Sequence, residues 1–476
     1  MFLDEVRVAL KSLIQDDKSV KADLNELSGI SIDSRTINPG EIFFAIQGDV
    51  TDGHFYIAQA VEKEAGLIVV EESKKSQVQG QLGQCAYISV TDTLKAMEAV
   101  GQAMREKTRA RIIGITGSVG KTSVRTALEV LLSRQGKTTA SQKSFNNHWG
   151  VPYSLCHLKA DDAYGVFEIG MNAPGEIRCL TQQIKPDVAL ITVIGEAHIG
   201  NLGSIEAIAE AKSEIFDGLN QSHGIAVINA DSPCFDIMHQ RAQEAGAQKI
   251  ITFGKSGYAN VRLVSQVMEG DGRDVTVDVM GQIVTLHLRM IGFQWVENAL
   301  AIMATIAAVG ADIHQAAQDF SRVGLLDGRG KVHHLSLRFG GTFTLIDDSY
   351  NANPTSVRSA LDTIAQVNGR RIVAFADMLE LGDQARGIHI GLAPKVMEAG
   401  VDKFFACGPL MGALYSYLPA NIQGAWKANS GQLLEPLTQE IRSGDVLLIK
   451  GSNSMKMTLL MEQICAFYLD QKVQSA

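Results

Sequence analysis

The sequence has no basic tract, no closely spaced cysteine pair and no long apolar run. Its 476 residues carry a formal charge of −9, so we expect no nucleic-acid partner. The longest uncharged, apolar-rich stretch, residues 298–311, is shorter than the roughly 20 residues that span a bilayer. Charges throughout the N-terminus do not match a signal peptide. Six cysteines without CxxC spacing indicate free thiols in a reducing compartment, so we expect a cytoplasmic enzyme with no membrane span.

The composition is that of a globular protein. Hydrophobic residues make up 46% and charged residues 20%, which supplies several apolar cores, and the length predicts two to four domains. The 45 glycines and 10 prolines follow no fixed period, which excludes a fibrous repeat. Although the net charge is negative, one or two placed cations and a helix N-terminus suffice to bind a phosphorylated small molecule.

Short apolar runs alternate with helical-period stretches, which predicts an α/β protein of three domains. We place a small α/β domain at residues 1–105, a central domain with a mostly parallel sheet at 106–326, and a third α/β domain at 327–476. A polar segment, Arg105–Arg109, and a glycine-rich segment, Gly324–Gly330, mark the boundaries. The clearest buried strands expected are Ile112–Ile115, Val166–Ile169, Val188–Ile194, Phe343–Ile346, Ile372–Phe375, Lys403–Ala406 and Val446–Ile449.

A glycine-rich turn joins the first central strand to an amphipathic helix. Glycines allow backbone N–H groups to approach a polyphosphate, and the N-terminus of the following helix attracts negative charge. Lys121 can then reach the β- and γ-phosphates, and the Thr122 hydroxyl can bind Mg²⁺. Ile115 stands where the standard phosphate-loop pattern has its first glycine, so an ordinary glycine turn is the alternative. The loop comprises Thr116, Gly117, Ser118, Val119, Gly120, Lys121, Thr122 and Ser123.

Two potential metal ligands follow other strands of the central series. Glu168 lies near the end of Val166–Ile169, and His198 lies just past Val188–Ile194. A carboxylate inside an apolar run is costly unless it is paired or bound to a cation. Ligands of open α/β sheets bind at the carboxyl ends of the strands, so we expect both side chains beside the phosphate loop. For each residue alone a salt-bridged glutamate or a loop histidine is the favoured interpretation; together with the phosphate loop, metal binding is favoured.

Lys212 is unusual because it lies on an apolar helix face. Ser204 can cap this helix, and the face includes Ile205, Ile208 and Ile215. One interpretation is a lysine that extends from the edge of the apolar face towards water. The other is a lysine buried for chemistry, or modified so that it is no longer a cation.

One expected strand of the third domain ends in two carboxylates, Asp347 and Asp348. Asn353 is expected to cap a helix whose first residue is Pro354. Lys450 follows another strand and would face the same side as Asp348 in a parallel sheet. These groups suit a polar ligand, and an Asx-rich turn without a ligand is the alternative.

Eight segments together resemble the Mur ligases of bacterial peptidoglycan synthesis over nearly the full length. Thr116–Ser123, Ala197–Ser204 and Ala211–Phe216 are typical of the family as a whole. The other five are Phe145–Pro152 (FNNHWGVP), Glu168–Ile177 (EIGMNAPGEI), Asp347–Pro354 (DDSYNANP), Asp377–Gly382 (DMLELG) and Lys450–Ser452 (KGS). Of these, FNNHWGVP, DDSYNANP and DMLELG are typical of the family member that adds D-alanyl-D-alanine.

The resemblance implies an ATP-dependent amide ligase with a domain for a UDP-sugar, a central ATPase and a Rossmann-like C-terminal domain that swings to close the site. ATP would phosphorylate the terminal carboxylate of a UDP-N-acetylmuramoyl tripeptide. The amine of D-alanyl-D-alanine would then attack the resulting acyl phosphate. This reaction would serve peptidoglycan precursor synthesis, and through it cell-wall biogenesis, cell shape and cell division. The resemblance also implies a monomer.

The resemblance assigns catalytic and metal-binding roles to five residues. Lys121 would neutralise charge on the transferred phosphoryl group. Thr122 and Glu168 would bind one Mg²⁺, and His198 with a carbamylated Lys212 would bind the second. Carbamylation would replace a cation with a carboxylate, which would explain a lysine on an apolar face beside a metal.

The resemblance also implies contacts to ATP and to the peptide substrate. Asn298 would contact adenine, Arg329 would lie near the phosphates, and Asp348 would bind the ribose. The resemblance implies that the substrate contacts include Ser34, Arg35, Gly48, Asp52, His54, Asn146 and Asn147. The polar groups at the strand ends of the third domain suggest three more, Asn351, Asn353 and Lys450.

The sequence departs from the family pattern at two places and leaves alternatives open. Gly292–Trp295 stands where Gly-Arg-His-Asn is frequent, and Asn453 stands where an arginine is common. Another Mur ligase, one that adds a diamino acid, would usually carry an Asp-Asn-Pro-Arg type of motif, which we do not find. A folylpolyglutamate synthase-like ligase would not need the UDP-sugar segments. A non-catalytic nucleotide switch would have no need of Glu168, His198 and Lys212 in one crevice.

Overall fold

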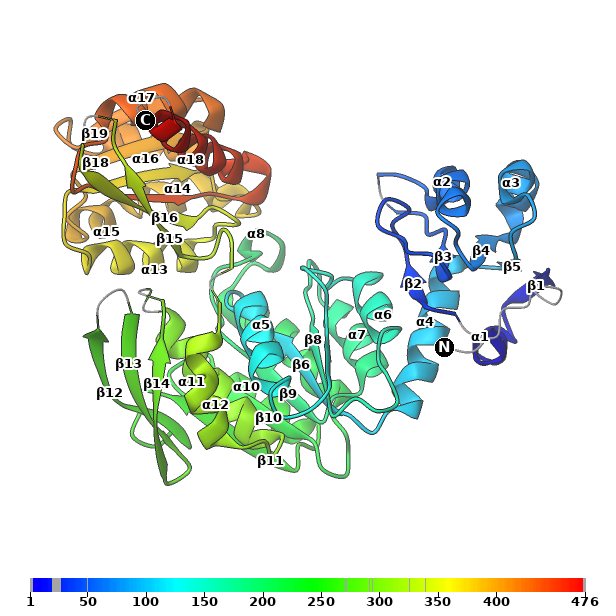
Figure 1. Cartoon of the computed structure of the whole chain (residues 1–476). Helices are drawn as coiled ribbons and strands as arrows, with labels where there is room; N and C mark the ends of the chain where they lie inside the picture. The colour runs from blue at the N-terminus through cyan, green and yellow to red at the C-terminus, as the bar shows by residue number, and fades with distance from the viewer. Residues whose placement is uncertain are drawn as a thin grey trace.

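The computed structural model of the chain describes residues 3–18, 27–48, 50–269, 272–290, 292, 294–324, 326–338 and 340–473. Figure 1 shows three bodies in chain order, coloured blue, cyan to green, and yellow to red. Each is built on its own sheet with helices packed against it, so the predicted three-domain α/β fold is confirmed. Among the described residues no helix has both the length and the apolar character needed to cross a membrane.

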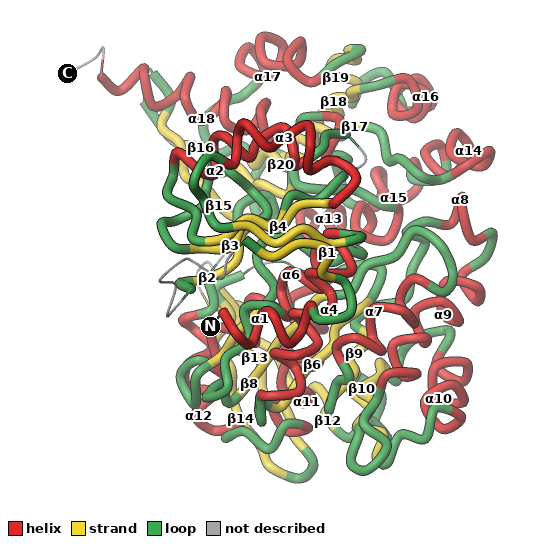
Figure 2. Tube along the Cα trace, turned by 90° about the vertical axis from the view of Figure 1, so that its right-hand side faces the viewer, coloured by secondary structure: helices red, strands yellow, loops and turns green. Residues whose placement is uncertain are grey.

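The N-terminal domain is a small sheet with helices on both faces. Its elements are α1 (Leu3–Leu10), β1 (Ile14–Asp17), β2 (Gly29–Ser31), β3 (Glu41–Phe44), η1 (Gly53–Tyr56), α2 (Ile57–Glu62), β4 (Leu67–Glu71), η2 (Glu72–Lys74), α3 (Lys75–Leu82), β5 (Tyr87–Val90) and α4 (Thr93–Lys107). The strand order is β1-β5-β4-β3-β2, and only β1 runs antiparallel to its neighbour. Helices α1 and α4 cover one face, and α2 and α3 cover the other (Figure 2). Burial on both faces explains the near-continuous apolar strands.

Helix α4 connects the N-terminal domain to the central domain. The polar segment Arg105–Arg109, predicted as a boundary, provides the last turn of this helix up to Lys107. Basic side chains stabilise that end because it carries the negative pole of the helix dipole. Arg105 also donates from Nε to the carbonyl oxygen of Ile184 in the central domain at 2.7 Å. The connection is therefore a packed helix rather than an extended linker, and the chain leaves it at residues 108–110.

The central domain is built on the largest sheet. Its elements are β6 (Arg111–Thr116), α5 (Lys121–Leu132), β7 (Thr138–Ala140), α6 (Gly150–Leu155), β8 (Tyr164–Glu168), α7 (Glu176–Ile184), β9 (Val188–Ile191), α8 (Ile199–Leu202), α9 (Ile205–Ser213), η3 (Glu214–Gly218), β10 (Ile225–Asn229), α10 (Phe235–Glu244), β11 (Lys249–Gly254), β12 (Val261–Glu269), β13 (Gly272–Val279), β14 (Gln282–Leu288), α11 (Gln294–Ala308), α12 (Ile313–Asp319) and η4 (Phe320–Arg322). The strand order is β14-β13-β12-β11-β10-β9-β6-β8-β7. The part from β7 to β12 is parallel, and β12, β13 and β14 pair antiparallel at one edge.

The parallel part places the phosphate-loop strand β6 between β8 and β9. Helices α5, α11 and α12 cover one face of the sheet, and α7, α9 and α10 cover the other. The predicted strand Val188–Ile194 is shorter than expected and ends at Ile191, because the following residues turn across the phosphate loop. Their contact is an isolated bridge between Val119 and Val193.

The C-terminal domain is a six-stranded sheet within the described residues. Its elements are β15 (Lys331–Ser336), β16 (Thr342–Asp348), α13 (Pro354–Ala365), β17 (Arg371–Ala376), η5 (Gly382–Gln384), α14 (Ala385–Ile390), α15 (Ala393–Glu398), β18 (Lys403–Cys407), α16 (Pro409–Tyr417), β19 (Gln423–Lys427), η6 (Ser430–Leu433), α17 (Leu434–Glu440), β20 (Val446–Lys450), η7 (Asn453–Met455) and α18 (Met457–Val473). The order is β15-β16-β20-β17-β18-β19, with β15 antiparallel at the edge. Helix α13 begins as predicted: Asn353 accepts from Ser356 N in a capping box, and Pro354 is the first helical residue.

Candidate active site

A cavity of about 370 Å³, called the crevice below, lies between the central and C-terminal domains. It is bordered by the carboxyl ends of β6, β8 and β9 in one sheet and of β16 and β20 in the other, where ligands of open α/β sheets bind. The predicted residues that line it are Ser118, Val119, Gly120, Lys121, Thr122, Ser123, Asn146, Asn147, Glu168, His198, Asn298, Arg329, Asp348, Asn351, Asn353 and Lys450. Those that do not line it are Thr116, Gly117, Lys212 and, in the N-terminal domain, Ser34, Arg35, Gly48, Asp52 and His54.

The phosphate loop holds a half-buried cation at the start of α5. Lys121 donates from Nζ to the carbonyl oxygen of Gly117 at 2.7 Å. Burial lowers the pKa of Lys121, the carboxylate of Glu168 opposes this shift, and the guanidinium of Arg329 adds to it. Two cations and a helix N-terminus therefore face one cavity, which is an arrangement that stabilises a bound anion.

Gly117 is required for the shape of this loop. Its φ is +149°, and a Cβ at this position would lie 2.0 Å from Oγ1 of Thr192. That threonine also donates to the carbonyl oxygen of Val119 at 2.6 Å. The loop is thus packed directly against the residue that follows β9, and a side chain at Gly117 has no space.

We expect Gly117→Ala to lower the free energy of unfolding by about 2 kcal/mol and the affinity for an ATP analogue by about tenfold, because the loop must move off Thr192. Thermal unfolding and titration with a fluorescent ATP analogue measure the two effects. Gly257→Ala is the matched control, since a Cβ there meets no atom within 4 Å. Equal behaviour of the two variants would contradict the assignment.

Glu168 is a buried carboxylate whose oxygens are both held by neutral donors. Thr122 donates from Oγ1 to Oε2 at 2.9 Å, and Asn146 donates from Nδ2 to Oε1 at 2.7 Å. The residue is 1% exposed, and among the described residues no lysine or arginine lies within ion-pair distance of it. A buried carboxylate beside a threonine hydroxyl is a set of hard oxygen donors that fits Mg²⁺.

His198 and Lys212 extend this site on the side of β9. Burial lowers the pKa of His198, the carboxylate of Glu380 opposes this, and the charges of Lys212 and Lys121 lower it further. Lys212 is 1% exposed, so the interpretation of a lysine that reaches water is wrong. Burial, and next the charge of Lys121, lower the pKa of Lys212 well below its ordinary value. Three nitrogen bases that repel one another as cations share this corner, which favours the neutral form of at least one of them.

The C-terminal domain closes the crevice with a second set of polar groups. Arg329 donates from Nη2 to Oγ1 of Thr122 at 3.1 Å, and its guanidinium lies 4.3 Å from the ring centroid of Tyr350. The hydroxyl groups of Tyr350 and Ser144 lie 2.8 Å apart. Arg329 thus reaches from the glycine-rich boundary segment, Gly324–Gly330, to the phosphate loop, beside the position expected for phosphates.

The two adjacent carboxylates predicted at the end of β16 have different surroundings. Lys450 donates from Nζ to Oδ2 of Asp348 at 2.6 Å, which confirms that both face the same side of the sheet. Burial raises the pKa of Asp348, and Lys450 opposes this. Asp347 instead accepts from Gly328 N at 2.8 Å and from the hydroxyl of Ser349 at 2.6 Å. Asp347 therefore stabilises the turn, and Asp348 remains available to a ligand.

In the N-terminal domain, His54 is committed to internal bonds. Glu71 N donates to Nε2 of His54 at 3.0 Å, so Nδ1 carries the proton and donates to Oδ1 of Asp52 at 2.6 Å. Lys74 donates to the other oxygen of Asp52 at 2.7 Å. Burial alone would raise the pKa of Asp52, yet these donors lower it to about 2. This geometry supports a positioning role for His54 in the η1 turn rather than a direct substrate contact.

The other predicted residues of this domain are more accessible or hold the adjacent loops. Ser34 donates to Oε1 of Gln59 at 2.7 Å. Arg35 pairs with Asp33 through two hydrogen bonds of 2.9 and 2.8 Å, and its side chain is 79% exposed. Gly48 N donates to the carbonyl oxygen of Thr51 at 2.9 Å. Arg35 is therefore accessible to solvent, although its charge is paired with Asp33.

Several contacts between the two domains were not assigned from the sequence. Arg358 pairs with Glu196 across the interface, and Nδ1 of His198 lies 2.7 Å from Oε2 of Glu380. Tyr350 and Glu380 lie within the DDSYNANP and DMLELG segments, so the sequence motifs included both residues but did not indicate what either residue does. Glu196 and Arg358 are separated by 162 residues and show no local pattern that would pair them.

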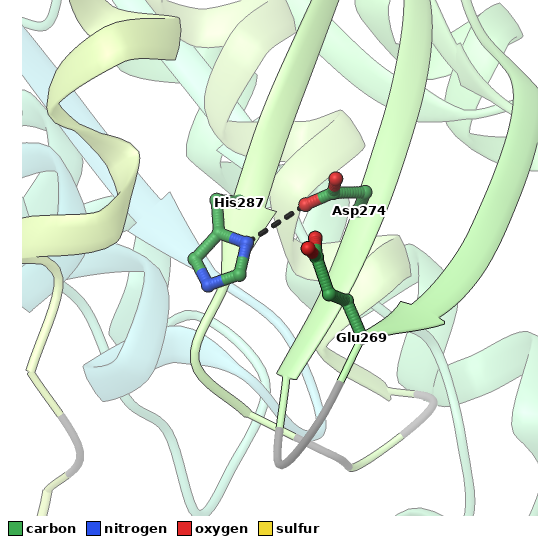
Figure 3. A group of neighbouring side chains, drawn as sticks. All are labelled: Glu269, Asp274 and His287. Carbon is green, nitrogen blue, oxygen red and sulfur yellow. Dashed lines mark hydrogen bonds and ion pairs between the residues drawn. The ribbon is translucent and has the colours of Figure 1, made fainter.

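A further group of possible metal ligands lies on the antiparallel edge of the central sheet. Figure 3 shows Glu269, Asp274 and His287 on β12, β13 and β14 with their side chains near one another, and their ligand atoms lie within 4.8 Å. Nδ1 of His287 lies 2.7 Å from Oδ1 of Asp274. Glu269 and His287 are exposed, and none of the three lines the crevice. Since His287 and Asp274 already pair with each other and exposed acidic groups commonly cluster without an ion, we assign no metal to them.

Comparisons with known proteins agree with this architecture. Three family models match: "Mur ligase family, catalytic domain" at residues 26–112, "Mur ligase middle domain" at 115–306 and "Mur ligase, glutamate ligase domain" at 332–453. The chain is 31% identical to UDP-N-acetylmuramoyl-tripeptide–D-alanyl-D-alanine ligase of Rickettsia prowazekii over 91% of this chain and 94% of that protein. It is 31% identical to the enzyme of the same name from Synechocystis, over 98% and 97%. The crystal structure of MurF from Acinetobacter baumannii matches 98% of each chain with 26% identity and a TM-score of 0.84.

Proposed function

Because this chain belongs to the Mur ligase family, we propose that it is an ATP-dependent, ADP-forming ligase that joins D-alanyl-D-alanine to a UDP-N-acetylmuramoyl tripeptide in peptidoglycan precursor synthesis. The observation that carries the proposal is the convergence of Lys121, Glu168 and His198 on one crevice between two domains. A switch protein would need the phosphate loop but not the buried carboxylate and the histidine.

The chemistry is the activation of an acid towards an amine. A carboxylate is a poor electrophile, so its oxygen first attacks the γ-phosphorus of ATP, which gives an acyl phosphate and ADP. The amine of D-alanyl-D-alanine then adds to the acyl carbon, and the tetrahedral intermediate collapses to the amide and inorganic phosphate. Lys121 and Arg329 neutralise negative charge on the transferred phosphoryl group, which is the main requirement of phosphoryl transfer.

We propose two Mg²⁺ sites in the crevice. Thr122 and Glu168 would hold one ion, and His198 with a carbamylated Lys212 would hold the second. Bound Mg²⁺ would supply charge neutralisation on the phosphates. The burial of Lys212 and its proximity to two further bases, His198 and Lys121, support carbamylation, because a carbamate would replace one of three mutually repelling cations with an anion.

The remaining substrate contacts follow the arrangement of the domains. We assign the UDP-sugar to residues 1–105, ATP to residues 106–326 and closure of the site to residues 327–476. Asn298, 5% exposed inside α11, would contact adenine, and Asp348 the ribose. Asn146, Asn147, Asn351, Asn353 and Lys450 line the crevice and would contact the peptide or the dipeptide. The six free cysteines support a cytoplasmic location, and we expect a monomer.

Phosphate release tests the proposal directly. We expect release only when ATP, Mg²⁺, a UDP-N-acetylmuramoyl tripeptide and D-alanyl-D-alanine are all present, with stoichiometric formation of the pentapeptide product detected by mass spectrometry. Release with a diamino acid, or with glutamate and a folate, would instead favour the alternative ligases. ATP turnover independent of both acid and amine would contradict the proposal.

A further inference from the structure

Helix α8 of the central domain contacts the DMLELG segment of the C-terminal domain through a backbone hydrogen bond and through Ile199, which packs on the apolar cluster that contains Met378 and Leu381. Gly200 N donates to the carbonyl oxygen of Glu380 at 3.2 Å. A Cβ on Gly200 would lie 2.4 Å from Gly382 N and 2.8 Å from the Glu380 carbonyl oxygen. Figure 1 shows α8 at the side of the central domain that faces the C-terminal domain. The close approach of the two segments therefore depends on glycine at this crossing.

The residues beside this crossing have an uncommon backbone conformation. His198 and Glu380 both have φ of +63°, in the left-handed region that costs a non-glycine residue free energy. Each therefore lies in a strained conformation that the surrounding contacts maintain. The two strained residues are neighbours across the domain interface.

That contact joins a crevice residue to a residue outside the crevice. Nδ1 of His198 lies 2.7 Å from Oε2 of Glu380. His198 lines the crevice and Glu380 does not, so Glu380 acts only through the histidine. The two atoms are at ion-pair distance but are not aligned as a hydrogen bond, and Nδ1 is buried without another partner among the described residues. A carboxylate beside Nδ1 favours a proton on that nitrogen and leaves Nε2 available for coordination, which is how a second residue tunes a metal-binding histidine. The other charged groups that act on His198 are Lys212 and Lys121, both repulsive to its protonated form.

We propose that Glu380 is a positioning residue that completes the second metal site only when the C-terminal domain is docked on α8. The inference rests on the proposed assignment of His198 as a metal ligand. Closure of the domains would then do more than bring substrates together: it would supply the carboxylate that fixes the tautomer and orientation of His198. An undocked C-terminal domain would leave His198 in an unfavourable backbone conformation without its partner.

The chain offers a matched control for the loss of an interdomain ion pair. Arg358 pairs with Glu196 across the same interface, two residues before His198 in sequence. This ion pair lies outside the crevice and has no contact with His198 among those described. A substitution of Arg358 removes this ion pair but leaves the backbone bond from Gly200 to Glu380 and the contact of Glu380 with His198 in place, whereas a substitution of Glu380 removes the contact to His198.

The test is a titration of the full chain with Mn²⁺ in the presence of a non-hydrolysable ATP analogue. The electron paramagnetic resonance signal of free Mn²⁺ measures how much of the metal is bound. We expect two ions in the unsubstituted protein, and loss of one in His198→Ala. Glu380→Ala should raise the dissociation constant of that same ion by about tenfold or more, and Glu380→Gln, which keeps an acceptor oxygen, by less. Arg358→Gln should leave the dissociation constant of this ion within about twofold of its value in the unsubstituted protein. Thermal unfolding confirms that each variant is folded, as expected for Glu380, whose side chain is 55% exposed.

The outcomes separate this inference from the proposed function. If His198→Ala loses an ion but Glu380→Ala binds both as the unsubstituted protein does, the positioning role is wrong and the metal assignment stands. The same conclusion follows if Arg358→Gln weakens binding of this ion as much as Glu380→Ala does. If His198→Ala retains both ions, the proposed metal assignment is wrong and the positioning role with it. As a second readout, the ring ¹⁵N signals of His198 should report a protonated Nδ1 in the unsubstituted protein and a mixture of tautomers in Glu380→Ala.

Discussion

Lys121→Met should lower kcat/KM by about a thousandfold, which corresponds to about 4 kcal/mol of lost transition-state stabilisation. Methionine keeps much of the length and apolar volume of the lysine but removes its charge. The structure gives the reason for a large effect: Lys121 is half-buried at the N-terminus of α5. Within the described part of the chain it donates only to the Gly117 carbonyl of its own loop, so its charge can act on a ligand in the crevice. Steady-state phosphate release at varied ATP concentration measures the effect.

The division between kcat and KM distinguishes two roles of this charge. Because charge accumulates on the phosphoryl oxygens during transfer, we expect most of the loss in kcat. Lys137→Met is the control, since Lys137 is 68% exposed and pairs with Asp161 at the surface of the same domain. A loss confined to KM would assign Lys121 to binding alone, and full activity of Lys121→Met would contradict the assignment of the phosphate loop.

Features determined by neighbouring residues could be predicted from the sequence. The turn between β6 and α5 has glycines at the positions where the backbone needs them, and the Asn353-Pro354 pair specifies the start of α13 through capping alone. The position of Glu168 and His198 beside the same loop was also accessible, because consecutive parallel strands all end at one edge of a sheet. These inferences need only local chemistry and one topological rule.

Features that depend on pairing across the chain could not be predicted in this way. Strands β12 to β14 have one buried face, so their apolar residues alternate, as at Val275, Val277 and Val279, and do not form the continuous runs that mark the buried parallel strands. The contact of His198 with Glu380 joins two domains whose relative position no local pattern encodes. The bond that fixes the tautomer of His54 likewise comes from Glu71, at the end of β4 and 17 residues away in sequence.

Replacement of Lys212 should lower the activity as much as replacement of Lys121 does, for a different reason. A buried amine whose pKa is lowered is unprotonated over a wide pH range, and only the unprotonated amine reacts with CO₂. The reaction forms an N–C bond and releases one proton, R–NH₂ + CO₂ → R–NHCOO⁻ + H⁺, so the carbamate is lost as the pH falls. Since the carbamate would be a metal ligand, Lys212→Met should lower kcat by about a thousandfold, equivalent to several kcal/mol of metal-dependent stabilisation.

Labelling separates the carbamate from a lysine that is merely buried. With ¹³C-bicarbonate, the unsubstituted protein should give a ¹³C carbamate resonance that disappears on acidification, and Lys212→Met should give none. Activity in CO₂-depleted buffer should fall and recover when bicarbonate is added, while the residual activity of Lys212→Met should not respond. Lys249→Met, at an exposed position of β11, is the control for lysine loss. A chain that is fully active without CO₂ and shows no carbamate signal would mean that Lys212 acts as an uncharged amine, and the second metal site would then need another anionic ligand.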